Sequence, residues 1–258
     1  MRIDKYQVRK DSLIIPLITF AVLILAFGYA GKLYRDQLVS NERASVESFL
    51  RPYANSLTTI ITHRTALIDA LVVFARAHPD REGLIGHFQH FAEGLYLSEN
   101  SVREIEIFAP QTAHLKYSGG DMRSSAPLSI AEYIQKEPSE TRADIERTIR
   151  TSKITLSGPF ELPDGSLILI ERQAIYHGDT LWGFAVVTFD FNELLINSGL
   201  PPANTNLEIA LIKDSGELIF GAPETLTTSP VRFQIDLPEG YWELAAAPQE
   251  GWNSAVQP

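Results

Sequence analysis

The chain has no cysteine among its 258 residues, and its formal net charge at pH 7 is −10. The absence of cysteine excludes disulfide bonds, thiolate metal sites and a cysteine nucleophile. The acidic balance argues against a nucleic-acid-binding protein, which needs a basic face toward the phosphate backbone. The Ser-Gly segments at 118–121 and 197–200 lack the flanking residues of a nucleophile elbow. We therefore expect neither an enzyme nor a cofactor-binding protein, and no nucleic-acid partner.

One long uncharged run, LIIPLITFAVLILAFGYAG, covers residues 13–31. A run of about 20 apolar residues can cross a bilayer as a helix. The segment 1–12 before it carries four basic and two acidic residues, so the rest of the chain carries a net −12. The positive-inside rule then predicts that residues 1–12 are cytoplasmic and that the residues after the run are periplasmic, in the inner membrane of a bacterium. The alternative is a cleaved signal peptide, whose apolar core is usually shorter, about 7–15 residues.

A helical pattern follows the apolar run from residue 32 to residue 77. Apolar residues recur at spacings of about three and four until a His-Pro-Asp segment ends the pattern. A helix of this length must bury its apolar stripe against its own domain or against a second copy of the chain. We expect a stalk that forms a parallel homodimer, and its expected seam is Val46, Phe49, Tyr53, Leu57, Ile60 and Leu67.

Helix and strand patterns alternate after the stalk. The sequence predicts a helix at 84–97, a strand at 102–109, a short strand that starts at 114, and two more helices before residue 154. Three strands follow up to residue 190, then a helix at 191–200 and short strands up to residue 248. Runs of helices followed by antiparallel strands are typical of the α+β class. We therefore expect two α+β modules in series on a transmembrane and stalk helix.

Several segments, taken in order, resemble a CHASE domain, the extracytoplasmic sensory module of bacterial and plant receptors. They are VREIEIFAP, SGPFELPDG, ILIERQAIY, WGFAVVTFDFNELL and the closing YWELAAAPQEGW, and the resemblance covers about residues 35–252. It implies two tandem PAS-like antiparallel-sheet modules: a membrane-distal, ligand-binding module at residues 80–190 and a membrane-proximal module at residues 191–252.

The resemblance also implies a second membrane span and a cytoplasmic output domain, such as a histidine kinase, a diguanylate cyclase or a cyclic-di-GMP phosphodiesterase. No motif of these domains occurs before Pro258. We expect the chain to be the sensory piece of a longer receptor, with residues 253–258 as a tail before the second span. The alternative is a sensor without an output domain.

A charged pair, Glu171-Arg172, lies in the most apolar of the predicted strands. Alternation places Arg172 on one face of the sheet and Glu171 on the other. An arginine inside a sheet needs a partner, because an unpaired buried charge costs several kcal/mol. An anionic ligand would supply one, since a guanidinium group binds a carboxylate in two-pronged geometry. The alternatives are a structural ion pair, for which the candidates are Glu106, Asp121 and Asp144, and a strand edge at which Arg172 reaches water.

The CHASE resemblance points to the same strand. In plant cytokinin receptors, a CHASE subgroup, the matching strand lines the ligand pocket, and a small polar residue there is similar in position to Arg172. Phe108, Tyr117 and Phe160 fall where the resemblance places the distal pocket, and aromatic side chains commonly line such sites. The expected ligand site is therefore Arg172, Tyr117, Phe108 and Phe160, although each aromatic residue is also consistent with an ordinary core position.

Two histidines, His87 and His90, have helical i, i+3 spacing. Such a pair could hold a metal with two further ligands, but we interpret both as solvated helix residues and expect no metal site.

Two functions remain open at this stage. The first is a periplasmic ligand sensor that signals across the membrane through the stalk. The second is a membrane-anchored module for dimerisation or protein interaction, without a small-molecule ligand. A small pocket under the distal sheet would favour the sensor, and a solidly packed distal core would favour the interaction module.

Overall fold

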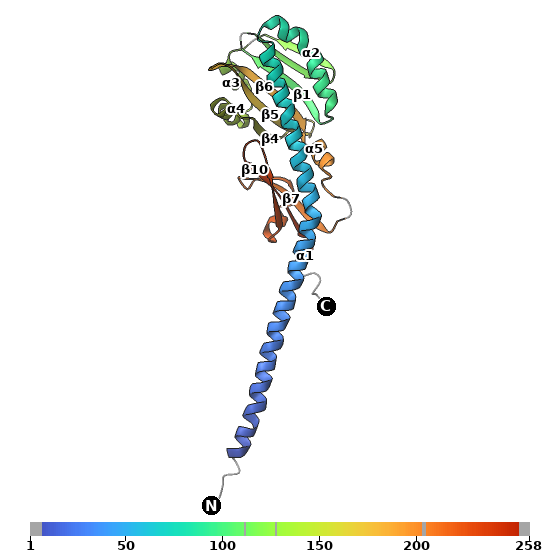
Figure 1. The fold of residues 1–258 in the computed structure, drawn as a ribbon, viewed down its shortest axis with the longest axis vertical. Helices are drawn as coiled ribbons and strands as arrows, with labels where there is room; N and C mark the ends of the chain where they lie inside the picture. Colours follow the sequence, from blue (N-terminus) through green and yellow to red (C-terminus); the bar gives the residue numbers. More distant parts are fainter. Residues whose placement is uncertain (1–6, 111, 127, 203–204, 253–258) are drawn as a thin grey trace, which may run out of the picture.

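Helix α1 (Gln7–Ala77) is a single continuous helix of 71 residues. In the computed structural model, which describes residues 7–110, 112–126, 128–202 and 205–252, it runs beside both modules to the far end of the molecule (Figure 1). Residues 1–6 and 253–258, which belong to the expected cytoplasmic segment and tail, lie outside the described residues. The continuous helix agrees with the expected transmembrane and stalk helix.

The N-terminal part of α1 extends away from the rest of the chain (Figure 1). It is long and apolar enough to cross a membrane, and none of that stretch is buried inside the protein. Its large side chains are exposed, with Phe27 at 77% and Leu25 at 73%. A continuous apolar surface of this kind is unfavourable in water and suits a lipid environment.

The membrane-distal module is built on one antiparallel sheet of six strands in the order β3-β2-β1-β6-β5-β4. The strands are β1 (Val102–Ala109), β2 (Ala113–Ser118), β3 (Asp121–Ser125), β4 (Thr155–Glu161), β5 (Leu167–His177) and β6 (Thr180–Asp190). The expected strands are present. The sheet has one further strand, β3, which follows the Gly119-Gly120 turn. The sequence does not predict it, because DMRSS has no alternation of apolar and polar residues.

Helices cover both faces of the distal sheet. Helix α1 and α2 (Arg81–Ser98) pack on one face, and α3 (Ile130–Lys136) and α4 (Ser139–Thr151) pack on the other (Figure 1). The Asp80 carboxylate caps α2 by accepting a hydrogen bond from the Gly83 amide at 2.7 Å, and Ser129 and Glu132 form a capping box at α3. The second face has its own small core, made of Phe108, Tyr133, Ile145, Ala174, Phe184 and Val186.

The membrane-proximal module contains a second antiparallel sheet, with strand order β8-β7-β10-β9. Helix α5 (Phe191–Ser198) connects it to the distal module. Its other elements are β7 (Leu207–Lys213), β8 (Leu218–Gly221), the 3-10 helix η1 (Pro223–Thr227), β9 (Val231–Asp236) and β10 (Tyr241–Pro248). Two antiparallel-sheet modules on a long N-terminal helix confirm the expected α+β class.

The apolar stripe of α1 is covered largely by the chain itself. Leu57 is fully buried, Val46 and Leu67 are also buried, and Tyr53 and Ile60 pack against the same core. This part of the helix lies against β9, β10, α5, β5 and β6. The dimer seam drawn from the sequence is therefore wrong for Val46, Leu57 and Leu67, because these side chains are already buried within one chain. Of the expected seam, Phe49 is the residue that stays exposed, at 38%.

Truncation of the buried stripe should destabilise the single chain. Leu57→Ala removes a fully buried side chain and should lower the free energy of unfolding by about 2–5 kcal/mol. The matched control is Val73→Ala on the same helix, where the side chain is 65% exposed and the change should stay below about 0.5 kcal/mol. Urea unfolding of the full chain in detergent, followed by tryptophan fluorescence, measures both. Equal effects of the two substitutions would contradict the packing of α1 described here.

Candidate functional site

A row of charged side chains crosses the distal sheet on the face covered by α3 and α4. Arg172 of β5 is the register partner of Val186 of β6, and Val186 is the partner of Glu106 of β1. Glu106 in turn is the partner of Lys116 of β2. Register partners in neighbouring antiparallel strands lie on the same face. The sheet therefore brings Arg172, Glu106 and Lys116 together from three strands.

A cavity of about 380 Å³ lies over this row. Its volume falls in the range of small-molecule sites. Its floor is the sheet and its rim includes the connection between α3 and α4. The charged residues of its wall are Arg103, Lys116, Arg172, Glu104, Glu106 and Glu137, and its apolar residues include Ile168, Ile170 and Val186. Of the two arrangements considered from the sequence, a pocket under the distal sheet and a solid core, the structure has the pocket.

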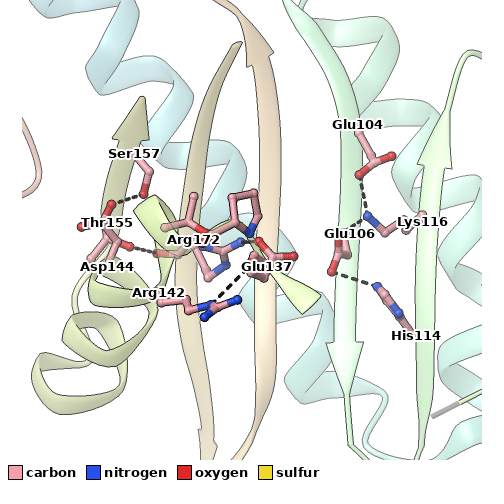
Figure 2. A network of polar contacts seen from close by, with 12 residues as sticks. Glu104, Glu106, His114, Lys116, Glu137, Arg142, Asp144, Thr155, Ser157 and Arg172 are labelled. Carbon is pink, nitrogen blue, oxygen red and sulfur yellow. Dashed lines mark hydrogen bonds and ion pairs between the residues drawn. The ribbon is translucent and has the colours of Figure 1, made fainter. Parts of the chain in front are cut away.

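Arg172 is the most deeply buried charged residue of the cavity wall, at 1% exposure. Its Nη2 donates a hydrogen bond to Glu137 Oε2 at 2.6 Å (Figure 2). Its Nε and Nη1 have no hydrogen-bond partner among the described residues. Burial alone would lower the pKa of Arg172, but the nearby Tyr133, Glu137 and Glu106 outweigh it and raise the pKa. The cavity wall therefore includes a buried cation, and two of its donor nitrogens are covered from solvent without an acceptor within hydrogen-bond distance among the described residues.

The partner of Arg172 is Glu137, and it is none of the three carboxylates proposed from the sequence. Glu137 lies at the C-terminal end of α3, immediately before Pro138 and α4. Arg142 of α4 fixes this connection by donating hydrogen bonds to the carbonyl oxygens of Glu137, at 3.2 Å, and Gln135, at 2.9 Å. Asp144 instead accepts hydrogen bonds from Arg147 and Ser157. The sequence carried no signal for Glu137, because a loop residue has no periodicity.

Tyr133 of α3 connects Arg172 to the aromatic core beside the cavity. The guanidinium carbon of Arg172 lies 5.9 Å from the centroid of the Tyr133 ring, within the range of a cation–π interaction. Tyr133 also stacks on Phe108, with ring centroids 4.1 Å apart, and on Phe184, with centroids 5.4 Å apart. Burial raises the pKa of Tyr133 well above its usual value, so this phenol is neutral. Phe108 thus supports Arg172 through Tyr133 without lining the cavity itself.

Glu106 is held ionised on the cavity wall by two basic partners. Its Oε1 lies 2.9 Å from His114 Nε2, and its Oε2 lies 2.7 Å from Lys116 Nζ (Figure 2). Lys116 also reaches Glu104 Oε1 at 2.9 Å. Burial would raise the pKa of Glu106, but the hydrogen bond from His114 and the charge of Lys116 lower it to about 2. The cavity therefore contains fixed negative charge opposite the positive charge of Arg172.

The structure separates the other two aromatic candidates from Arg172. Tyr117 of β2 is the register partner of Ile105 of β1. The same row of register partners continues to Val187 of β6 and ends at Glu171 of β5. Tyr117 therefore lies on the opposite face, where its ring contacts Tyr96 of α2 with centroids 5.6 Å apart. Phe160 of β4 is half-buried and lines a different hollow, beside α4. Of the four expected site residues, Arg172, Phe108 and Phe160 belong to one face of the sheet and Tyr117 to the other, and Arg172 is the one that lines the cavity.

The two helical histidines do not converge on one point. His87 Nδ1 lies 2.8 Å from the carbonyl oxygen of Gly83, and its ring lies 4.9 Å from the ring of His78. The side chain of His90 is 96% exposed. In the described part of the chain, no group of three or more His, Asp or Glu side chains could hold a metal ion.

The fold is shared with the sensory domains of bacterial chemoreceptors. One similar structure is the sensory domain of Campylobacter jejuni Tlp3 with isoleucine bound, with a TM-score of 0.60, 11% identity, and coverage of 85% of this chain and 98% of that one. A second is the ligand-binding domain of Pseudomonas aeruginosa PctC in complex with GABA, with a TM-score of 0.57, 13% identity, and coverage of 80% and 99%.

A third is the ligand-binding domain of Pseudomonas fluorescens CtaA in complex with L-serine, with a TM-score of 0.56, 11% identity, and coverage of 82% and 99%. No protein-family model and no curated protein matches the chain by sequence. At these identities the likeness shows a common fold, and the CHASE resemblance stays a prediction.

The buried Glu106 should make the protein sensitive to acid. Its folded pKa of about 2 is below the ordinary value of 4.5, so its stabilisation is complete above pH 4.5 and is lost as the pH falls through 2. On acidification between these limits, the wild type should lose up to about 3 kcal/mol of unfolding free energy through Glu106. Glu106→Gln has no carboxylate at this position and should lose less stability by that amount. Denaturant unfolding at pH 2.5 and pH 5 measures the difference. The exposed Glu140→Gln is the control, and the same acid loss in both variants would contradict the assignment.

Proposed function

We propose that this chain is the periplasmic ligand-sensing region of a membrane receptor, and that the distal cavity binds a small molecule with a carboxylate group. The observation that carries the proposal is Arg172, which is buried on the cavity wall with two donor nitrogens that no described residue uses. A buried donor without a partner is costly, and more so on a charged group. A carboxylate accepts two parallel hydrogen bonds from a guanidinium group. An anionic ligand group would therefore accept hydrogen bonds from Nε and Nη1 of Arg172, which have no acceptor in the described part of the chain.

The cavity also has a place for a positive group. Glu137 and Glu106 stand on its wall together with Arg172, and Glu137 is the more accessible of the two, with 20% of its side chain exposed. A ligand that carries an ammonium group close to its carboxylate would match the positive charge of Arg172 and the negative charge of Glu137. Amino acids have this pattern, and the structures similar to this chain include domains with isoleucine, GABA and L-serine bound. We infer that an amino acid or a related zwitterion is the ligand class.

The proposed receptor spans the inner membrane of a bacterium with the apolar part of α1. The distal module would then act through α1 on an output domain beyond this chain, in a plan similar to that of CHASE receptors. A homodimer remains part of the proposal, with contacts along the exposed part of α1, which includes Phe49 and the residues nearer the membrane. The cavity favours this sensor over an interaction module without a ligand.

Substitution of Arg172 should weaken ligand binding without unfolding the protein. At a ligand concentration of one hundred times Kd, the wild-type chain should gain about 2.7 kcal/mol of stability. Arg172→Lys keeps the charge and loses the two-pronged geometry, so Kd should rise at least about tenfold, which corresponds to 1.4 kcal/mol. Thermal unfolding of the full chain in detergent, with a panel of amino acids, measures both quantities.

The control for this experiment is Arg123→Lys, on the exposed face of β3, which should bind like the wild type. If Arg172 serves only as a structural ion pair with Glu137, Arg172→Met should instead lower the stability of the ligand-free chain by about 3–5 kcal/mol. If Arg172→Met is destabilised in this way and still binds an amino acid of the panel with wild-type affinity, the proposed site is refuted.

The membrane topology can be tested with reporter fusions. Alkaline phosphatase fused after Pro258 should be active, and a fluorescent protein that matures only in the cytoplasm should be dark at the same position. Both results follow from the four basic residues before the apolar run. Fusions after Ser12 provide the control and should behave in the opposite way. A fluorescent fusion after Pro258 would place the modules in the cytoplasm and contradict a periplasmic sensor.

A further inference from the structure

Arg64 of α1 is buried in the distal core on the side of the sheet opposite the cavity, at 1% exposure. Its Nε donates a hydrogen bond to Ser101 Oγ at 2.9 Å. Its Nη2 lies 3.4 Å from Glu99 Oε1, a distance at the long limit for a hydrogen bond. Its Nη1 has no hydrogen-bond partner among the described residues. The guanidinium group is therefore held by one good hydrogen bond, one long ionic contact and a cation–π contact with Phe189 of β6, whose ring centroid lies 5.4 Å from its central carbon.

Glu171 of β5 faces the same core and is 2% exposed. Its Oε2 also has no hydrogen-bond partner in the described part of the chain. Burial raises the pKa of Glu171 to about 8; Arg64 opposes this rise, and Asp69 of α1 adds to it. The carboxyl group is therefore mostly protonated at neutral pH.

Helix α5, which also packs on β5, contributes the buried residues Phe191, Leu194, Leu195 and Ser198 to this module.

Arg64 and Glu171 interact electrostatically, but no ion pair within 4.0 Å joins them. The ion pair of Arg64 is with Glu99, which lies between α2 and β1 and whose other basic neighbour is His63 at 3.8 Å. This arrangement is stable only while Glu171 is neutral, because a buried carboxylate without a partner is strongly unfavourable. Once ionised, Glu171 would attract the guanidinium group of Arg64. That group has one donor nitrogen without a partner, and its contact with Glu99 is long.

We propose that Arg64 exchanges carboxylate partners, from Glu99 when Glu171 is protonated to Glu171 when it is ionised, and that the exchange displaces α1 relative to β5. Arg64 belongs to the helix that continues into the membrane-spanning stretch. Glu171 is adjacent in sequence to Arg172, which lines the distal cavity. The exchange is therefore a charge-controlled contact between the cavity strand and the stalk helix.

The absence of cysteine makes the displacement directly measurable. Cysteines introduced by Val73→Cys on α1 and Glu161→Cys on β4, both at exposed positions, are the sole attachment sites for two spin labels. The full chain in lipid nanodiscs is measured by pulsed electron spin resonance between pH 5 and pH 9.5. We expect the distance between the labels to change with a midpoint near pH 8. Glu171→Gln, which mimics the protonated carboxyl group, should keep the low-pH distance at every pH.

A second variant tests the direction of the exchange. Glu99→Gln removes the competing carboxylate and should move the midpoint to lower pH, because Arg64 is then free to stabilise ionised Glu171. The exposed Glu140→Gln is the control and should leave the midpoint in place. A constant distance in the parent protein, or the same pH dependence in Glu171→Gln, would overturn the proposal. The experiment contains no ligand, so its outcome is independent of the proposed Arg172 site.

Discussion

Strand β5 carries two opposite charges at consecutive positions inside an otherwise apolar sheet. The alternation of side chains along a strand sends Arg172 toward α3 and α4 and Glu171 toward α1. Neither group can remain charged and unpaired in the interior. Arg172 stays charged and is paired with Glu137, whereas Glu171 avoids the cost because burial favours its protonated form. The two faces of one strand thus compensate their buried charges in different ways.

The charges on the cavity face depend on each other. Glu106 stays ionised because His114 and Lys116 contact it, and its negative charge in turn helps to keep Arg172 protonated. The pairs leave Nε and Nη1 of Arg172 without acceptors. In the proposed function, an anionic group would bind to Arg172 without breaking the ion pairs of Arg172 and Glu106. The connection between α3 and α4, which carries Glu137, is then the part of the wall that a ligand would contact together with the sheet.

Helix α1 connects this module mechanically to the apolar stretch that could cross a membrane. It is continuous from the apolar stretch to the far end of the distal module, and it packs on strands of both sheets. A displacement of α1 against β5 would therefore be transmitted to the apolar stretch through one continuous helix. The burial of Leu57 and its neighbours within one chain leaves fewer residues for contacts between two copies. A dimer formed through α1 would use the exposed side of the helix.

Much of the architecture followed from local patterns in the sequence. The apolar run, the length of the stalk helix, most strands and the opposite orientation of Arg172 and Glu171 depend on periodicity, which neighbouring residues determine. Only the tertiary structure decided that Glu137, from a loop, pairs with Arg172, and that Tyr117 lies on the opposite face from it. Both depend on strand register, and a shift of one residue exchanges the faces. The burial of Leu57 by its own chain was likewise decided by long-range packing, which an amphipathic pattern does not specify.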